Sequence, residues 1–509
     1  MPLLRKGVLI PSKGIDWSVP ETFIDDRSGY PKNMTFARNE IRKRAGKSLY
    51  GSTPMSSQVM GLSRLELNDG AKYLIRNSKT QSQKYNVNTS DWEDISNVDF
   101  TGGDTDYFSY TTATEYGYLI VTNGVDAIRK WNGITDLTAL GGSPPKAKYC
   151  SYLSPYLILG YVDDGSVNSP WKVQWWDPTS EDWNSGNAGS LLLSDEQSEI
   201  KNLLKLNNYM AVYKQDSLCF LQKVGPPDIF LSTTVRTGIG LAASRCVVDA
   251  EGIHYFMGDN DFYQWNGGQP VSIGRSVRDE VFMRINRELI DKCFAVHIKE
   301  YKEIWFFIVI TGDTWPKEVW KFNYGEGLWY YDTCSDITTG ARYERSSSLV
   351  WDDMEGVWDD WNIPWDSAIN SSGFEDVILG DSSGKTLYLN YANANDVTTS
   401  IDSYFISKAF TGDRLEFNKR WLKLDVWARG TDGAKLYIDY STDYGQTWNG
   451  VSYNSSSVYI PLTNAKKRYS VYFDVVSETI MFRFRNSSAG EIFYLTNFYP
   501  YYIVKEQLR

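Results

Sequence analysis

The sequence predicts an all-β protein: a β-propeller of six or seven blades and a C-terminal β-sandwich, with one amphipathic helix inserted. Three observations predict this fold. Pairs of apolar strands joined by polar turns recur at roughly 40 to 50 residues, the period of four-stranded propeller blades. Short alternating strands replace this repeat near the C-terminus, as expected for a sandwich. One stretch, residues 277–294, carries the clearest helical spacing of apolar side chains in the chain.

Residues 1–54 are predicted to form an extended N-terminal arm, with turns at Ser28-Gly29 and at Pro31. A basic cluster follows these turns and consists of Arg38, Arg42, Lys43, Arg44 and Lys47. Two interpretations stay open for it. The cluster is either a solvated strand end or a patch that faces DNA phosphate or an acidic partner.

Residues 55–395 are predicted to form the propeller. In each repeat an apolar run such as 118–121 or 156–159 is followed by a second strand that ends in an aromatic, such as Trp131 or Trp265. Asn-Gly dipeptides after these aromatics are hairpin turn signals, because both residues tolerate positive φ. The repeats share no WD dipeptide or kelch glycine pair, so the number of blades stays open.

Two insertions interrupt the propeller repeat. The helix predicted over residues 277–294 presents Val277, Phe282, Ile285, Leu289 and Phe294 on one face, which should pack on the propeller body. Residues 351–366 are rich in tryptophan and acidic side chains and are predicted to form a loop. Its carboxylates do not follow the spacing of a calcium-binding loop, so a contact between subunits is favoured and metal binding stays open.

Residues 396–509 are predicted to form the β-sandwich, after a polar linker over 393–400. Within it, Ser441, Asp443, Gly445 and Trp448 match the Asp-box pattern S-x-D-x-G-x-x-W. We expect Asp443 to accept backbone hydrogen bonds across the turn and Gly445 to supply an unusual φ. Trp448 should pack beneath, so the motif predicts a structural turn.

Composition limits the classes of function. Lys and Arg total 52 and Asp and Glu total 63, which gives a formal net charge of −11 and argues against a protein that coats nucleic acid. The five cysteines are scattered, without a CxxC pair, and signal neither a zinc site nor a disulfide framework. The first residues lack the pattern of a signal peptide, and the longest apolar run is too short to span a bilayer. We therefore expect a protein that does not insert into membranes.

The motifs of common enzyme classes are missing from the sequence. There is no GxSxG elbow, HExxH helix or phosphate-binding GxxxxGKS loop. His254 lies in an apolar strand and His297 follows the helical stretch, so both are interpreted as structural. The prediction is a protein without catalytic, cofactor-binding or metal-binding residues.

Several segments resemble one family. They are the arm residues GID…NM…IRKRAGKS, the run VYKQDSLCFLQKVGPPDIF, residues 252–282 followed by KEIWFF, and the C-terminal runs RLEFNKRW, YIDYSTDYGQTW and FRFRN. This pattern is similar to the tail nozzle, or packaged-DNA stabilisation, proteins of tailed bacteriophages. The resemblance is one of pattern over most of residues 14–509, without a motif as specific as a metal-ligand signature.

The resemblance implies a structural virion protein that assembles in the host cytoplasm and forms a homohexameric ring in the tail. The ring would lie below the portal or the head-to-tail adaptor, and a tail fibre, spike or needle protein would dock beneath it. It would retain the packaged double-stranded DNA and conduct it at ejection without specific binding. The Asp box keeps an alternative open: a carbohydrate-binding or glycan-cleaving propeller used in host attachment.

Overall fold

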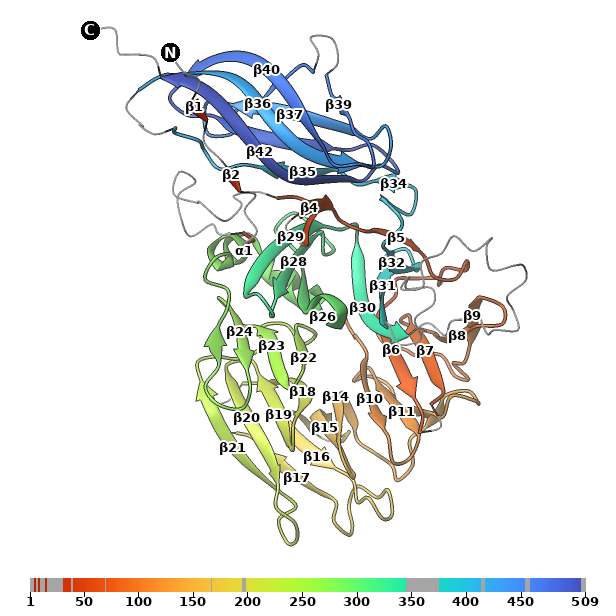
Figure 1. The fold of residues 1–509 in the computed structure, drawn as a ribbon. Helices are drawn as coiled ribbons and strands as arrows, with labels where there is room; N and C mark the ends of the chain where they lie inside the picture. Colours follow the sequence, from red (N-terminus) through yellow and green to blue (C-terminus); the bar gives the residue numbers. More distant parts are fainter. Residues whose placement is uncertain are drawn as a thin grey trace.

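The computed structural model describes residues 4–5, 8–9, 14–15, 31–37, 40–68, 70–165, 167–194, 198–344, 375–412, 417–453 and 458–504. These residues form a multi-blade, propeller-like body of small sheets and an adjacent sandwich (Figure 1). The predicted all-β class is confirmed. The acidic tryptophan loop, residues 351–366, lies outside the described residues.

Seven sheets build the propeller within the described residues, and six of them have four strands each. Blades one to three contain β6 (Gly61–Glu66), β7 (Lys72–Asn77), β8 (Ser82–Asn86), β9 (Asp91–Asp94), β10 (Ser109–Ala113), β11 (Tyr118–Thr122), β12 (Arg129–Trp131), β13 (Thr138–Ala139), β14 (Lys146–Leu153), β15 (Tyr156–Asp163), β16 (Asn168–Trp175) and β17 (Gly189–Leu192). Blades four to six contain β18 (Ile200–Leu206), β19 (Tyr209–Lys214), β20 (Ser217–Lys223), β21 (Phe230–Thr237), β22 (Val247–Ala250), β23 (Ile253–Met257), β24 (Phe262–Trp265), β25 (Val271–Ser272), β26 (Phe294–Ile298), β27 (Glu303–Ile308), β28 (Glu318–Asn323) and β29 (Leu328–Thr333).

The seventh blade combines strands from both ends of the propeller sequence. It contains β30 (Ile337–Glu344), β31 (Glu375–Asp381), β32 (Thr386–Asn390) and the arm strand β5 (Gly46–Leu49), with the short β33 (Asn395–Asp396) and β34 (Thr399–Ser400) beside them. β5 pairs antiparallel with β32. The N-terminal arm therefore supplies a strand that closes the ring, next to a strand more than three hundred residues later in the chain.

The second strand of each blade is the most apolar, because its two faces pack on the neighbouring blades. In β15, residues 156–160 are all buried, and β11 and β23 are buried almost throughout. Trp131, Trp265 and Trp320 end or lie within third strands and are at most 1% exposed. These strands are the ones that the sequence repeat predicted.

Arg245 joins blades that lie far apart in the ring order. It precedes β22 of blade five. Its guanidinium donates to the carbonyl of Thr338 in blade seven at 2.8 Å and to that of Lys292, which precedes blade six, at 3.0 Å. The ring of Tyr107, which leads into blade two, lies 3.6 Å from the guanidinium carbon. Contacts with blades two, six and seven place Arg245 across the axis of the propeller.

The helix predicted over residues 277–294 is wrong in extent. The α-helix α1 (Arg278–Arg284) ends at Ile285, where the backbone becomes extended with ψ 137°. Ile285 forms a β-bridge to Ile310. Asn286 then caps a 3-10 segment (Arg287–Lys292), and Phe294 begins β26. Tertiary pairing with the sheet overrides the helical spacing here. The apolar residues before Phe294 still pack on blades five and six, in one core with Phe262 and Phe306, whereas Phe294 packs in the core between blades six and seven.

The sandwich consists of two sheets around one core of aromatic and aliphatic side chains. One sheet contains β3 (Met34–Ala37), β4 (Glu40–Lys43), β42 (Phe493–Val504), β36 (Lys419–Gly430) and β40 (Lys467–Ser477), with β1 (Leu4–Arg5) and β2 (Val8–Leu9) on β42. The other contains β35 (Ser403–Ile406), β41 (Met481–Asn486), β37 (Lys435–Ser441), β38 (Asn449–Gly450) and β39 (Ile460–Pro461).

The arm is not a separate unit, which corrects the predicted boundary at residue 54. β4 pairs with β42, and Met34 and Ile41 are fully buried in the sandwich core. Three residues after β4, the chain enters blade seven as β5. Backbone N–H and C=O groups need partners, and both sheets offer an edge to an extended segment. Figure 1 shows β4 and β5 running between the two parts.

Candidate functional site

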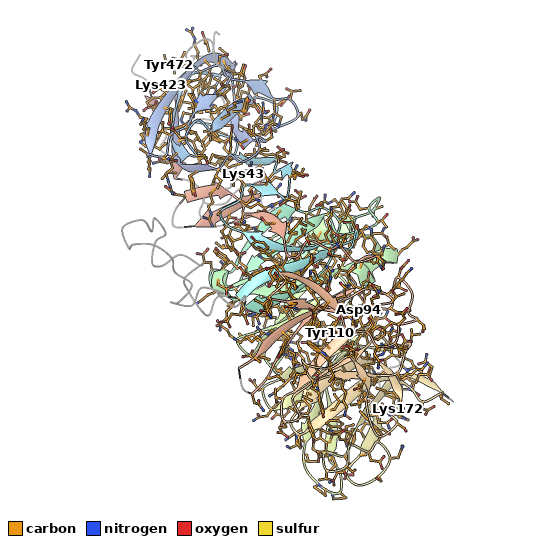
Figure 2. All side chains as sticks on the ribbon, turned by 90° about the vertical axis from the view of Figure 1, so that its right-hand side faces the viewer. Lys43, Asp94, Tyr110, Lys172, Lys423 and Tyr472 are labelled. Atoms are coloured by element: carbon orange, nitrogen blue, oxygen red, sulfur yellow. The ribbon has the colours of Figure 1, made fainter. Side chains whose placement is uncertain are left out.

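The predicted basic cluster lies at the junction of propeller and sandwich. Lys43, Arg44 and Lys47 are 2%, 8% and 4% exposed, and Figure 2 shows Lys43 between the two parts. A partner- or DNA-facing patch, or a solvated strand end, requires exposed side chains. For these three residues both interpretations are therefore wrong, because burial inside the chain gives them partners of their own. Arg42 is partly exposed, and Arg38 lies outside the described residues.

Asp396 of β33 is the counter-ion of this cluster. Arg44 binds it with two nitrogens, at 2.9 and 2.7 Å, and the Lys47 ammonium lies 3.2 Å from the same carboxylate. Burial acts to raise the pKa of Asp396, but the hydrogen bonds and charges of Arg44 and Lys47 outweigh it and hold the pKa at about 2. The sequence placed Asp396 in a polar linker and gave no signal of this role.

The remaining bonds of Arg44 connect further elements. Its Nε donates to the Asn33 side chain at 3.0 Å, and a terminal nitrogen donates to the Thr333 carbonyl at the end of β29, at 3.1 Å. Lys43 points into the sandwich, where its ammonium donates to Asn486 at 3.0 Å. Burial lowers the pKa of Lys43 to about 8. Two adjacent arm residues thus bind the two parts of the protein from opposite faces of the arm.

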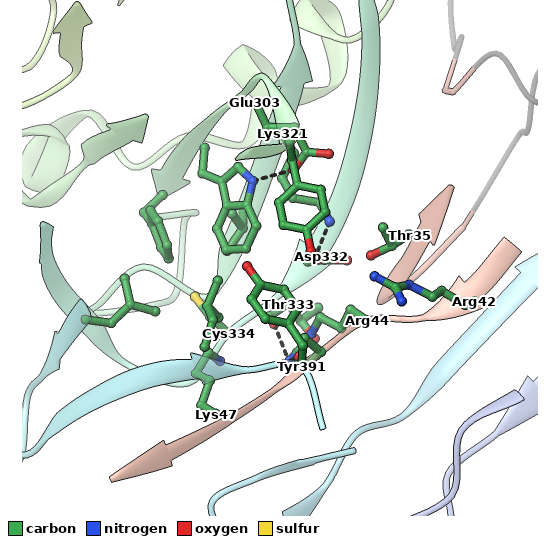
Figure 3. A pocket seen from close by; sticks show the side chains of 17 residues that line it. Thr35, Arg42, Arg44, Lys47, Glu303, Lys321, Asp332, Thr333, Cys334 and Tyr391 are labelled. Atoms are coloured by element: carbon green, nitrogen blue, oxygen red, sulfur yellow. Dashed lines mark hydrogen bonds and ion pairs between the residues drawn. The ribbon is translucent and has the colours of Figure 1, made fainter. Parts of the chain in front are cut away.

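A pocket lies beside this junction, between blade six, blade seven and the arm (Figure 3). It holds about 560 Å³ of space not filled by atoms, the open mouth included. Its walls are largely apolar and include Trp305, Phe307, Val319, Leu379 and Leu389.

Charged side chains from the arm and blade six complete the pocket lining. Lys321 and Asp332 form a buried ion pair of 2.7 Å, and the Trp305 indole donates to Glu303 at 2.7 Å. Burial raises the pKa of Glu303, against the opposing effects of Lys321 and Trp305. The sequence did not predict this cluster. Its members lie on β27, β28 and β29 of blade six, and the repeat pattern pairs such strands without showing which charged side chains meet.

The Asp-box residues form a compact turn after β37. Asp443 accepts hydrogen bonds from the Thr447 backbone N–H at 2.9 Å, from its hydroxyl at 2.6 Å and from the Ser441 hydroxyl at 2.7 Å. These bonds hold the pKa of Asp443 at about 2. Gly445 has φ +87°, and the Arg483 guanidinium lies over the Trp448 ring at 4.6 Å. The carboxylate is engaged in the turn itself.

Both histidines are buried and hydrogen-bonded. His254 contacts the Tyr213 hydroxyl through Nδ1 at 2.8 Å and the Lys205 carbonyl through Nε2 at 3.0 Å. His297 contacts the Tyr324 hydroxyl at 3.1 Å. Burial lowers the pKa of each imidazole to about 4. Each residue is therefore neutral at pH 7 and holds neighbouring strands together.

Neither a metal site nor a membrane span emerges from the described part of the chain. No group of three or more His, Cys, Asp or Glu side chains there is arranged to hold a metal ion. No helix in these residues has the length and apolar character needed to cross a membrane. The five cysteines are unpaired.

Comparison with known proteins adds little to this description. No protein-family model matches the chain, and no curated protein matches it significantly. A similar solved structure is the extracellular domain of a putative hybrid two-component system from B. thetaiotaomicron, with 10% identity and a TM-score of 0.40. The match covers 81% of this chain and 48% of that chain, so this chain spans about half the length of its neighbour.

Proposed function

We propose that this protein is a structural subunit of a bacteriophage tail, a nozzle that forms a ring below the portal or its adaptor. Six copies, or a multiple of six, would surround the DNA exit path, with a fibre, spike or needle protein below. The ring would retain the packaged genome and conduct it at ejection. The segments that resemble the nozzle family are the origin of this proposal, and the geometry of the junction favours a mechanical role.

The observation that carries the proposal is the arm that fastens propeller to sandwich. Strands β4 and β5 are close in sequence but belong to different parts, and the buried Arg44–Asp396–Lys47 cluster lies where they separate. A flexible linker would let the two parts rotate independently. A chain that holds packaged DNA under pressure needs a fixed geometry, and a buried, hydrogen-bonded junction supplies it.

The path of the DNA in this proposal lies between copies of the protein. Arg245 crosses the axis of the propeller and contacts blades two, six and seven, which supports a lumen formed between copies and not within one propeller. Rings of this kind arise when head-to-tail contacts close by rotation. The net charge of −11 fits a wall that repels phosphate, along which DNA slides without binding.

The proposal is tested on mature particles that contain the protein. Quantitative mass spectrometry should find six copies per particle or a multiple of six, and imaging along the tail axis should place them in one ring around the DNA. Copies that are missing from particles, or that occupy a peripheral position with another stoichiometry, contradict it.

A second assay addresses the alternative of host attachment. The purified protein is incubated with bacterial surface polysaccharides, and binding and release of reducing ends are measured. The nozzle proposal expects neither. Release that disappears when one carboxylate is replaced would favour a glycan-cleaving propeller, and saturable binding without release would favour a lectin-like one.

A further inference from the structure

Two buried polar atoms at the junction pocket have no hydrogen-bond partner among the described residues: Arg42 Nε and Asp332 Oδ1. Both residues line the pocket. Figure 3 shows the Arg42 guanidinium pointing from the arm toward the part of the pocket where Asp332 lies. A buried donor and a buried acceptor without partners are costly, so such atoms usually mark the place of a missing partner.

The other charged groups of the pocket are already engaged. Arg44 and Lys47 share Asp396, and Lys321 binds the second oxygen of Asp332. Arg42 forms no ion pair with any residue that the structure describes. The pocket therefore presents one uncompensated positive charge and one free carboxylate oxygen, and Asp332 is only 3% exposed.

The free groups define the chemistry that would complete them. A simple anion would bind Arg42 but would bring negative charge toward Asp332. A simple cation would bind Asp332 but would leave Arg42 unpaired and add positive charge. A water molecule has a donor and an acceptor but cannot neutralise the guanidinium. A carboxylate with a hydrogen-bond donor on the next carbon satisfies both atoms at once.

We propose that the junction pocket binds a small carboxylate with a neighbouring hydroxyl or ammonium group, that is, a 2-hydroxy acid or a 2-amino acid. The carboxylate contacts Arg42, and the hydroxyl or ammonium donates to Asp332 Oδ1. The aromatic and aliphatic wall around Trp305 and Phe307 accommodates a short apolar substituent. The site is independent of the nozzle proposal and would exist in the free subunit.

The test uses the full chain and four probes that separate the two points of recognition. Glycolate and glycine carry both groups, acetate carries only the carboxylate, and methylammonium carries only the donor. Binding is measured by calorimetry and by chemical-shift changes at constant ionic strength. We expect glycolate and glycine to bind roughly tenfold or more tightly than acetate or methylammonium, because each single-group probe lacks one charged hydrogen bond.

Variants tie the binding to the pocket. Arg42→Met removes the free donor without breaking an ion pair among the described residues, and it should weaken glycolate and glycine roughly tenfold or more. Asp332→Asn should weaken glycine more than glycolate, because the charge facing the ammonium is lost. Arg420→Met is the matched control, since Arg420 pairs with Asp474 on the exposed face of the sandwich.

Three results overturn the proposal. The first is equal affinity for all four probes, and the second is no binding of any probe at millimolar concentration. The third is unchanged glycolate and glycine binding in a folded Arg42→Met protein. Circular dichroism of each variant establishes folding, and Arg42→Met keeps the test decisive if Asp332→Asn does not fold.

Discussion

Replacing Asp396 with asparagine removes the carboxylate that Arg44 and Lys47 share at the junction. The pKa of Asp396 falls from 3.8 to about 2 on folding. At about 1.36 kcal/mol per pKa unit, this difference corresponds to roughly 2.4 kcal/mol of stability at neutral pH. Asparagine also leaves two buried cations without a counter-ion, and breaking a buried pair in this way typically costs about 3–5 kcal/mol. Both figures describe one interaction, so we expect a loss of about 3–4 kcal/mol.

Urea unfolding at pH 7 measures this loss. Asp402→Asn is the matched control, because Asp402 binds Lys32 at 3.0 Å where the arm meets sandwich strand β35, but is 54% exposed. An exposed pair contributes at most about 1 kcal/mol. Limited proteolysis should cut Asp396→Asn between propeller and sandwich at lower denaturant than either the control or the unchanged protein. Equal unfolding midpoints for the two variants would refute the reasoning, since the buried cluster would then contribute no more than a surface pair.

The same cluster predicts a pH dependence. The folded-state pKa of Asp396 lies below the unfolded value, so the unfolded chain takes up the proton first as pH falls. The stabilisation is therefore complete above the unfolded pKa of 3.8 and is lost as pH falls from there toward 2. The difference in stability between the unchanged protein and Asp396→Asn should stay constant from neutral pH to about pH 5 and then shrink. A difference that persists at pH 2 would assign it to packing.

Three further substitutions, one of them with a matched control, test other parts of the fold. Arg245→Met leaves carbonyls of two blades unpaired, and it should lower the free energy of unfolding by about 2–4 kcal/mol in a urea titration; an unchanged midpoint would show that the ring does not need this contact. Phe282→Ala should cost about 1–2 kcal/mol, because the half-buried ring packs 5.2 Å from that of Phe262, whereas Met283→Ala, on a side chain that is 76% exposed, should be neutral. Asp443→Ala should speed amide exchange at the Asp-box turn and leave the global unfolding midpoint in place; an effect on the whole sandwich would contradict a local role.

Much of the fold was predictable because the packing of blades requires apolar side chains at positions that recur along the sequence. A second strand with both faces buried has to be apolar along its length, as β11 and β15 are, and its partner often ends in an aromatic that fills the space between blades. The inner and outer strands of a blade have fewer apolar side chains, so their pattern in the sequence is weaker. β21, at the outer edge of blade four, is largely exposed, and its sequence is mostly polar. The predicted strand pairs were therefore the middle of each blade.

The candidate site was predictable only as a cluster of charges. The sequence singled out Arg38, Arg42, Lys43, Arg44 and Lys47, but it could not show whether they face solvent or the interior. For Arg44 and Lys47 that depends on Asp396, and for Lys43 on Asn486, both more than three hundred residues away. The helix over 277–294 failed for a similar reason. The Ile285 N–H still donates to the Val281 carbonyl, but the chain becomes extended at Ile285, which forms a β-bridge to Ile310.

By itself the sequence determined the all-β class, the propeller repeat, the change to a sandwich near the C-terminus and the local turn built on Asp443. Each of these depends on interactions between residues close in the chain or on burial that repeats at a fixed period. Tertiary structure alone decided the number of blades, the closing role of β5, the position of Arg245 and the partners of the basic arm. These features come from strand edges and charged side chains that are hundreds of residues apart in the chain. No local sequence pattern specifies which strand pairs with which edge.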